Sequence, residues 1–254
     1  MKRKKIGIIT FHDADNLGAV LQTYALQNVL NNECGVASEV IDYKNKKITE
    51  TKGFKKCFGI KDYIKFIPMQ IYYFIKRRGF EKFRKTSLTI SSKRYNDISI
   101  KYCKEEYDAF ISGSDQIWNP IITKGINPFY FGDISGVKNR ISFAASLGRE
   151  KYDETDEQKA AELIRNMDYV SVREEKSVEY IKNISGKDVV DVCDPVFLLE
   201  KEEYEKIAKP INVKQPYLLL CKSTKTMKKY CKFLFACPIV AALLAHSSCQ
   251  SYSS

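Results

Sequence analysis

The sequence predicts an α/β fold, built on a doubly wound, Rossmann-like parallel sheet over about residues 1–205. Short runs rich in β-branched and other apolar residues recur along this part of the chain, and the first of them, at residues 6–10, predicts a buried strand. Stretches with apolar side chains at helical spacing separate most of these runs. Because strands joined by crossover helices run parallel, the alternation favours one open parallel sheet.

The N-terminal part of the chain contains one strand–helix–strand unit. Residues 6–10 form a β-branched run, residues 19–30 carry apolar side chains at helical spacing, and residues 39–43 form a second strand-like run. Gly35 follows the expected helix, at a position where a left-handed cap is common. This unit predicts two neighbouring parallel strands joined by a helix.

The alternation of strands and helices resumes after residue 105. Strand-like runs and helical stretches follow one another, which raises the expected number of strands to six. The four further strands are expected at residues 107–112, 140–146, 168–172 and 189–192, and the helices between them at residues 156–166 and 174–181.

Residues 52–94 interrupt the alternation and are rich in basic and aromatic side chains. Within residues 52–85, eleven Lys and Arg stand against Asp62 and Glu81, and nine aromatic residues are interleaved with them. One interpretation is an insertion of helices whose aromatic face packs on the domain while the lysines are solvated. The alternative is an amphipathic surface that docks on an anionic membrane or on a lipid-linked acceptor. Nucleic acid is disfavoured, because no recognisable nucleic-acid motif accompanies the charge.

The composition, with 44% apolar and 29% charged residues among 254, excludes intrinsic disorder and fibrous repeats. The formal net charge of +11 comes from the first 100 residues, which hold 20 Lys and Arg against 9 Asp and Glu, and it predicts anionic partners. None of the eight cysteines forms a Cys-x-x-Cys pair, so their spacing gives no support for a zinc site. No export signal precedes the first strand, and a cytoplasmic protein with reduced thiols is therefore expected.

Polar residues follow the carboxyl ends of the expected strands. In a parallel sheet these ends lie along one edge, and ligands bind there near the point where the strand order reverses. We therefore expect the polar residues to converge on one site. They are His12, Asp13, Asp15, Asn16 and Gly18 after the first strand, residues 112–120 with Ser114, Asp115, Gln116 and Trp118 after the third, Ser146 and Arg149 after the fourth, Arg173 after the fifth and Asp194 with Pro195 after the sixth.

Arg173 and His12 each allow a functional interpretation and a structural alternative. The rigid fork of Arg173 matches carboxylate and phosphate oxygens, and the alternative is a salt bridge to Glu174 or Glu175. His12 is one of only two histidines and is a candidate for proton transfer, with a solvated loop histidine as the alternative.

Three other residues allow a binding role and a structural role equally. Trp118 lies beside acidic and amide side chains, as in sugar-facing sites, but it could equally anchor its loop in the core. Asn16 and Gly18 lead into a helix N-terminus, whose free N–H groups suit a phosphate or a carboxylate. Asn16 could instead be only a helix cap, and Gly18 could only ease a tight turn.

Five motifs resemble the polysaccharide pyruvyl transferase family, and they follow one another along the chain in that family's order. The most specific is Gly113-Ser-Asp-Gln-Ile-Trp-Asn119, within Tyr107–Pro120. The others are Asp15–Gln27, Ile141–Gly148, Val170-Ser-Val-Arg-Glu174, and Asp194-Pro195 with Leu198-Leu199, and the likeness covers roughly residues 5–220.

The resemblance implies a two-domain fold similar to type-B glycosyltransferases, of which this chain holds the N-terminal half, with the active site in the cleft between the halves. It implies transfer of a pyruvyl group from phosphoenolpyruvate, as co-substrate, to sugar hydroxyls of a bacterial surface polysaccharide, giving a cyclic ketal without a further cofactor or metal. Such a site needs donors for two anionic groups, an acid for the methylene carbon and a base for the hydroxyl. We expect His12 and Asp115 to be catalytic, and Asn16, Gly18, Gln22, Ser114, Gln116, Trp118, Ser146 and Arg173 to bind substrate.

The C-terminal residues depart from the family pattern. Residues 216–220 look like the first strand of a second domain, but the Arg-x-His motif that the family carries in its second half is not found after them. Residues 221–254 hold four of the eight cysteines and no acidic residue. We expect residues 210–254 to be the first strand of an incomplete domain and a non-native tail, left by a frameshift or premature end, with impaired activity.

Two alternative functions stay open at this point. A glycosyltransferase that uses a nucleotide sugar has the same architecture, and fold does not determine chemistry. A non-catalytic module that binds glycans or membranes would use the basic aromatic segment. The expected partners are phosphoenolpyruvate, a sugar or lipid-linked oligosaccharide acceptor, and an anionic membrane contacted peripherally at its inner face, but not nucleic acid.

Overall fold

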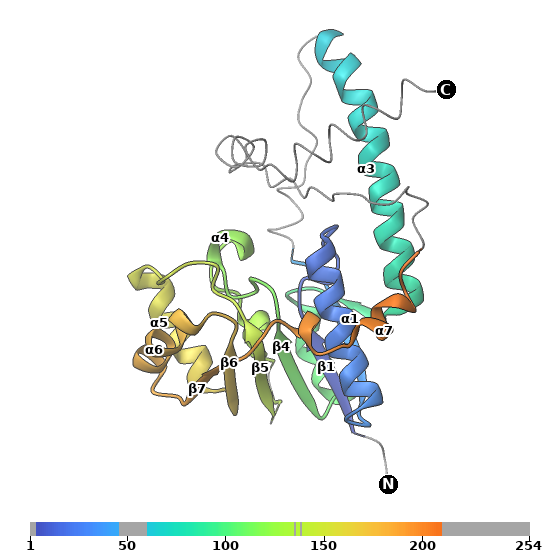
Figure 1. The fold of residues 1–254 in the computed structure, drawn as a ribbon. Coiled ribbons are helices and arrows are strands. Elements are labelled where there is room, and N and C mark those ends of the chain that lie inside the picture. Colours follow the sequence, from blue (N-terminus) through green and yellow to red (C-terminus); the bar gives the residue numbers. More distant parts are fainter. Residues whose placement is uncertain (1–3, 46–59, 135, 138, 210–254) are drawn as a thin grey trace, which may run out of the picture. The chain divides into compact units, whose positions relative to one another are not determined.

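The computed structural model describes residues 4–45, 60–134, 136–137 and 139–209, and these hold one parallel sheet with flanking helices (Figure 1). Within this part of the chain the sheet has seven strands, in the order β3-β2-β1-β4-β5-β6-β7. All neighbouring strands pair in parallel, which confirms the predicted Rossmann-like fold. The strands are β1 (Lys5–Ile9), β2 (Ala37–Tyr43), β3 (Ile90–Tyr95), β4 (Ala109–Gly113), β5 (Arg140–Ala145), β6 (Tyr169–Val172) and β7 (Val189–Asp191).

Helices and 3-10 turns connect the strands. Within the described ranges, no helix has the length and apolar content that crossing a bilayer requires. The α-helices are α1 (Leu17–Asn32), α3 (Ile60–Ser87), α4 (Pro120–Thr123), α5 (Glu154–Arg165), α6 (Glu175–Ser185) and α7 (Lys201–Glu205), and the 3-10 turns are η1 (Ser99–Glu106), η2 (Pro128–Phe131) and η3 (Pro195–Phe197).

The edge strand β3 was not expected from the sequence. Its residues 90–94 belong to the segment that the sequence sets apart as a basic insertion, yet Ile90 pairs with Val40 and Arg94 with Asp42 of β2. The strand reads Ile-Ser-Ser-Lys-Arg-Tyr, and its three central side chains are exposed. Because an edge strand has a neighbour on one side only, it tolerates polar and basic residues that hide the usual strand pattern. The prediction of six strands was therefore wrong by one.

The sheet is buried on both faces, as the apolar runs predict. Ile8, Val40 and Ile111 point to one face, where Leu26 and Leu30 of α1 pack on them. Their neighbours along the strands, such as Ile9 and Phe110, point to the other face. There they join a larger cluster with side chains of α5, α6 and the segment between β4 and β5. This alternation across a pleated strand explains why the central strands carry apolar side chains at consecutive positions.

The strand order reverses between β1 and β4. From β1 the chain proceeds outward to β2 and β3, whereas from β4 it proceeds in the opposite direction to β7. The loops after β1 and β4 therefore flank the switch point, which is where ligands bind in this class of fold. The chain after β7 then returns through η3, which packs against α1.

The strands β4 and β5 approach each other closely at Gly113. A Cβ atom on this residue would lie 1.9 Å from the carbonyl oxygen of Phe143, far inside any real contact distance. Glycine is therefore required here because two backbones approach closely, and not because the residue needs a backbone conformation that only glycine adopts readily. The residues that follow Gly113 and Phe143 form the candidate site described below.

We predict that Gly113→Ala lowers the free energy of unfolding by about 3 kcal/mol or more, because the clash is with backbone that cannot move independently. Urea denaturation followed by circular dichroism measures this. Gly79→Ala is the matched control, because Gly79 lies in α3 and a Cβ added to it would meet nothing within 4 Å. There alanine should raise the stability by roughly 0.5–1 kcal/mol. Equal effects of both substitutions would contradict the proposed backbone contact.

Candidate active site

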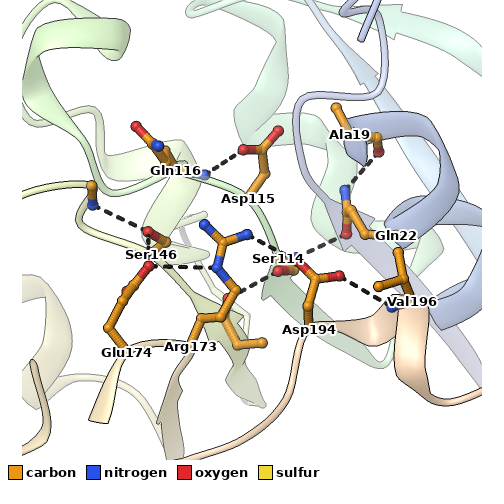
Figure 2. Close-up of polar contacts among 12 residues, drawn as sticks. Ala19, Gln22, Ser114, Asp115, Gln116, Ser146, Arg173, Glu174, Asp194 and Val196 are labelled. Atoms are coloured by element: carbon orange, nitrogen blue, oxygen red, sulfur yellow. Dashed lines mark hydrogen bonds and ion pairs between the residues drawn. The ribbon is translucent and has the colours of Figure 1, made fainter. Parts of the chain in front are cut away.

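Arg173, directly after β6, lies between two carboxylates at the carboxyl edge of the sheet (Figure 2). Its Nη1 is 2.9 Å from Oδ2 of Asp194, and its Nε is 3.4 Å from Oε1 of Glu174. The side chain is 27% exposed, and among the described residues Nη2 makes no hydrogen bond. The salt bridge to Glu174 is thus present, and one edge of the guanidinium group is still open to a ligand.

Glu174 connects Arg173 to the loop after β5. Its Oε1 accepts a hydrogen bond of 2.5 Å from Oγ of Ser146, which in turn accepts one of 3.1 Å from the backbone N–H of Gly148. Its Oε2 is buried and has no hydrogen-bonding partner among the described residues. A buried carboxylate oxygen without a partner is energetically costly, so this atom is a position where a donor on a ligand would be favourable.

The loop after β4 holds Asp115 in a left-handed backbone conformation, with φ of 67°. The Asp115 side chain is fixed by the N–H of Gln116, which donates to Oδ1 at 2.7 Å, and its carbonyl accepts from the N–H of Ser146 at 3.1 Å. Ala144, just before Ser146, is also left-handed, with φ of 51°. Strained residues of this kind gather at functional sites. Asp115 lies in the loop after β4, and Ala144 lies near the carboxyl end of β5, so both are at the edge where these segments converge.

Asp194 joins the returning C-terminal segment to this cluster. Its Oδ2 contacts Arg173, and its Oδ1 caps η3 by accepting from the N–H of Val196 at 3.1 Å. Because η3 packs against α1, the position of Asp194 is set by an element far away in sequence. The sequence shows the Asp-Pro pair of the family motif but not that it pairs with Arg173.

Gln22 and Ser114 are buried, and their polar groups are used within the protein. The amide nitrogen of Gln22 donates to Oγ1 of Thr10 at 2.8 Å and to the carbonyl of Ala19 at 2.9 Å, and its oxygen accepts from the N–H of Ser114. Oγ of Ser114 donates to the carbonyl of Ala144. These contacts join α1 to the residues that follow β1 and β4, and Figure 2 draws those of Gln22 with Ala19 and Ser114. The predicted substrate contacts of both residues stay a prediction.

Trp118 lies in the core, 1% exposed. Its Nε1 donates to the carbonyl of Tyr130 at 3.0 Å, and its ring stacks on Phe131 with centroids 5.0 Å apart. Of the two interpretations that the sequence leaves open, the structural one describes this environment, since the indole anchors the loop that carries Asp115 and Gln116.

The loop after β1 ends at Asn16, whose Oδ1 caps α1 by accepting from the N–H of Ala19 at 3.2 Å. Asn16 and Gly18 are exposed at the carboxyl edge. Arg84 of α3 forms an ion pair with this loop: its Nη2 is 3.1 Å from Oδ1 of Asp15. Arg84 lies outside every motif that the sequence shows, and sequence reasoning therefore missed this ion pair.

His12 is buried rather than solvated, and it points to the β2 side of the switch point. Its Nε2 lies 3.3 Å from Oδ1 of Asp42, whose Oδ2 is 2.7 Å from Nε of Arg94 on β3. Burial raises the pKa of the Asp42 carboxyl, but the contacts with His12 and Arg94 outweigh burial and lower it overall. The catalytic role of His12 stays a prediction.

A cavity of about 320 Å³ opens farther along the same side, between the segments after β2, β3 and β4. The hydroxyl of Tyr43 donates to Asp97 and accepts from the amide of Asn127 at 2.9 Å, and all three side chains line the cavity. Carboxylate, amide and phenol groups could hydrogen-bond a polar ligand. The sequence does not indicate these three residues as a site, because they come from separate parts of the chain: the end of β2, the segment after β3 and the segment between β4 and β5.

The chain matches the family model described as polysaccharide pyruvyl transferase over residues 16–245. The chain belongs to this family. No curated protein and no solved structure matched it significantly. The matched range places the pyruvyl transferase likeness beyond residue 220, where we expected it to end, and this corrects that boundary. Residues 210–254, with the expected strand and tail, lie outside the described residues, and the expected truncation stays a prediction.

The lowered pKa of Asp42 predicts a specific loss of stability in acid. A carboxyl whose pKa is lower in the folded than in the unfolded state contributes stability above its unfolded value, near 3.8, and loses it as the pH falls through the folded value. We expect the unfolding free energy of Asp42→Asn to fall less steeply than that of the wild type between about pH 5 and pH 2.

Chemical denaturation at a series of pH values measures the two slopes. Asp188→Asn removes one carboxylate from a side chain that is 91% exposed and serves as the control. Parallel slopes for Asp42→Asn and the wild type would show that the contacts with His12 and Arg94 do not stabilise the fold.

Proposed function

We propose that this family member transfers a pyruvyl group from phosphoenolpyruvate to sugar hydroxyls of a bacterial surface polysaccharide, forming a cyclic ketal. The observation that carries the proposal is the placement of Arg173 at the carboxyl edge, held by two carboxylates and with Nη2 open. The family match supports the reaction class, since it describes transfer of pyruvyl to polysaccharide. Phosphoenolpyruvate as the donor is our inference.

The reaction balances with two sugar hydroxyls and one phosphoenolpyruvate. A proton is added to the methylene carbon, C2 gains oxocarbenium character, and the first hydroxyl attacks C2 and loses its proton. The C2–O bond to phosphate then breaks, the second hydroxyl attacks C2, and its proton leaves with inorganic phosphate. The site must therefore hold two anionic groups, deliver one proton to carbon and accept protons from hydroxyls.

Arg173 is the proposed ligand of the donor. Its guanidinium fork binds carboxylate or phosphate oxygens in a planar geometry, and Asp194 and Glu174 hold the fork in place. These two carboxylates also compete with an anionic ligand for Arg173. The donor must therefore bind at the open Nη2 or displace one carboxylate, and further cationic groups are needed for a ligand with both phosphate and carboxylate.

Asp115 is the proposed proton-transfer group. It lies in the cluster that Ser146 links to Glu174, whereas His12 is paired with Asp42 on the other side of the switch point. The left-handed backbone and the bond from Gln116 fix the direction of its carboxylate. Asn16, Gly18, Gln116 and Ser146 are the proposed surrounding substrate contacts.

We expect Arg173→Ala to lower the affinity for phosphoenolpyruvate at least tenfold, roughly the loss of one charge-assisted hydrogen bond. Arg173→Lys should retain part of the affinity, because it keeps the charge but not the fork. Isothermal titration calorimetry measures both. Arg165→Ala, at an exposed arginine of α5, is the matched control. Unchanged affinity in Arg173→Ala would remove Arg173 from the donor site.

We expect Asp115→Asn to bind phosphoenolpyruvate normally but to turn over roughly a hundredfold more slowly, as is typical for loss of a proton-transfer group. Asparagine tolerates the left-handed conformation, so the loop geometry is conserved. Phosphate release with a polysaccharide acceptor gives the rate, and mass spectrometry shows whether the sugar gains one pyruvate less one water. Release of a nucleoside diphosphate from a nucleotide sugar, with no consumption of phosphoenolpyruvate, would instead indicate glycosyl transfer.

A further inference from the structure

Helix α3 carries a run of large apolar side chains that no other part of the described chain covers. Residues 71–75 read Ile-Tyr-Tyr-Phe-Ile, and each is more than half exposed. Because successive residues of an α-helix are 100° apart, five in a row point in all directions around the axis. No packing of one helix face could bury them all, and such a stretch marks a contact with an apolar environment.

The next turns of α3 are strongly basic. Between residues 76 and 85, five exposed or half-buried basic side chains stand against one acidic residue, Glu81, which pairs with Arg77 at 2.9 Å. Arg84 is not counted, since it is paired with Asp15. The surface is therefore positively charged next to the apolar run. The five basic residues are Lys76, Arg77, Arg78, Lys82 and Lys85.

The aromatic residues of this region have the arrangement expected at an interface between water and an apolar phase. Tyr72 and Tyr73 are in edge-to-face contact, and the guanidinium of Arg78 lies 4.8 Å from the ring centroid of Phe74. Tyrosines with one polar and one apolar end, next to basic side chains, are enriched where a membrane meets water.

The basic end of α3 is joined to the candidate active site. Phe83 packs edge-to-face on Tyr24 of α1, and Phe80 lines an apolar cavity with Leu17, the first residue of α1. Arg84 binds Asp15 in the loop that follows β1. The helix is therefore fixed to the carboxyl edge of the sheet, where substrates are proposed to bind.

We propose that residues 71–85 of α3 dock on an anionic lipid bilayer, with the apolar run in the interfacial layer and the basic residues on the lipid headgroups. A bilayer combines an apolar interior with an anionic surface, which complements both parts of this segment. A second copy of the chain fits less well, because it would bring like charges together. Nucleic acid would leave the two isoleucines in water.

Vesicle co-sedimentation with the full chain tests the proposal. We expect the chain to bind vesicles of phosphatidylglycerol and phosphatidylcholine, and high salt to weaken this binding. The affinity for vesicles of phosphatidylcholine alone should be lower by roughly tenfold or more. The double variants Tyr73→Ser/Phe74→Ser and Arg78→Gln/Lys82→Gln should each reduce the binding. The matched controls are Tyr169→Ser/Phe197→Ser and Lys159→Gln/Lys176→Gln, which change exposed residues elsewhere and should bind like the wild type.

The substitution Tyr73→Trp reports insertion directly. The wild-type chain has one tryptophan, Trp118, which is buried, so quenching by brominated lipids should leave wild-type emission unchanged. Tyr73→Trp should be quenched by those lipids and should shift its emission to the blue. Phosphoenolpyruvate affinity, measured on the same variants, separates this proposal from the function proposed above, because docking variants should keep it.

Three results would overturn the proposal. The first is equal binding to neutral and anionic vesicles. The second is no quenching of Tyr73→Trp in a chain whose circular dichroism matches the wild type. The third is a change in oligomeric state or in RNA binding on Tyr73→Ser/Phe74→Ser while vesicle binding is unchanged, which would assign the surface to a second copy or to nucleic acid.

Discussion

The geometry of the candidate site depends on one close backbone contact, between Gly113 at the end of β4 and Phe143 in β5. Only a residue without a side chain allows it, since a Cβ would meet the Phe143 carbonyl at 1.9 Å. The contact brings the next residues within hydrogen-bonding distance, so that Ser114 donates to Ala144 and Ser146 donates to Asp115. Through Ser146 the same network reaches Glu174 and so the guanidinium of Arg173. A polar site is thus built on a rigid joint between two strands.

The site combines one arginine with three carboxylates, and this balance limits its chemistry. Arg173 is oriented by Asp194 and Glu174 and keeps Nη2 open, where it can donate to a carboxylate or phosphate oxygen of a ligand. The carboxylates suit proton transfer and hydroxyl binding. Since Arg84 of α3 also holds the loop after β1, the proposed docking surface and the proposed site lie on connected elements. An acceptor carried by a lipid would then reach the site from the membrane side.

Much of the fold followed from patterns within the sequence, and the exceptions have physical causes. The buried central strands are rich in apolar residues and were predicted, whereas the edge strand β3 was missed because polar residues are tolerated where only one neighbour pairs. The loop after β4 was recognised by its motif, but its tryptophan faces the core and stacks on Phe131. The direction of a side chain in a loop depends on what packs against the loop, and the spacing of apolar residues in the sequence does not reveal it. The apolar and basic composition around α3 was visible, but not which residues are exposed.

The sequence by itself determined that strands and helices alternate, and therefore that polar residues after successive strands share one edge of the sheet. It also determined the family, through motifs that are contiguous in the chain. The tertiary structure decided which of these residues meet. Arg173 pairs with Asp194 because the returning chain packs η3 against α1, and His12 pairs with Asp42 because β1 and β2 are neighbours. Such partners lie far apart along the chain, and strand order and register, rather than local preference, bring them together.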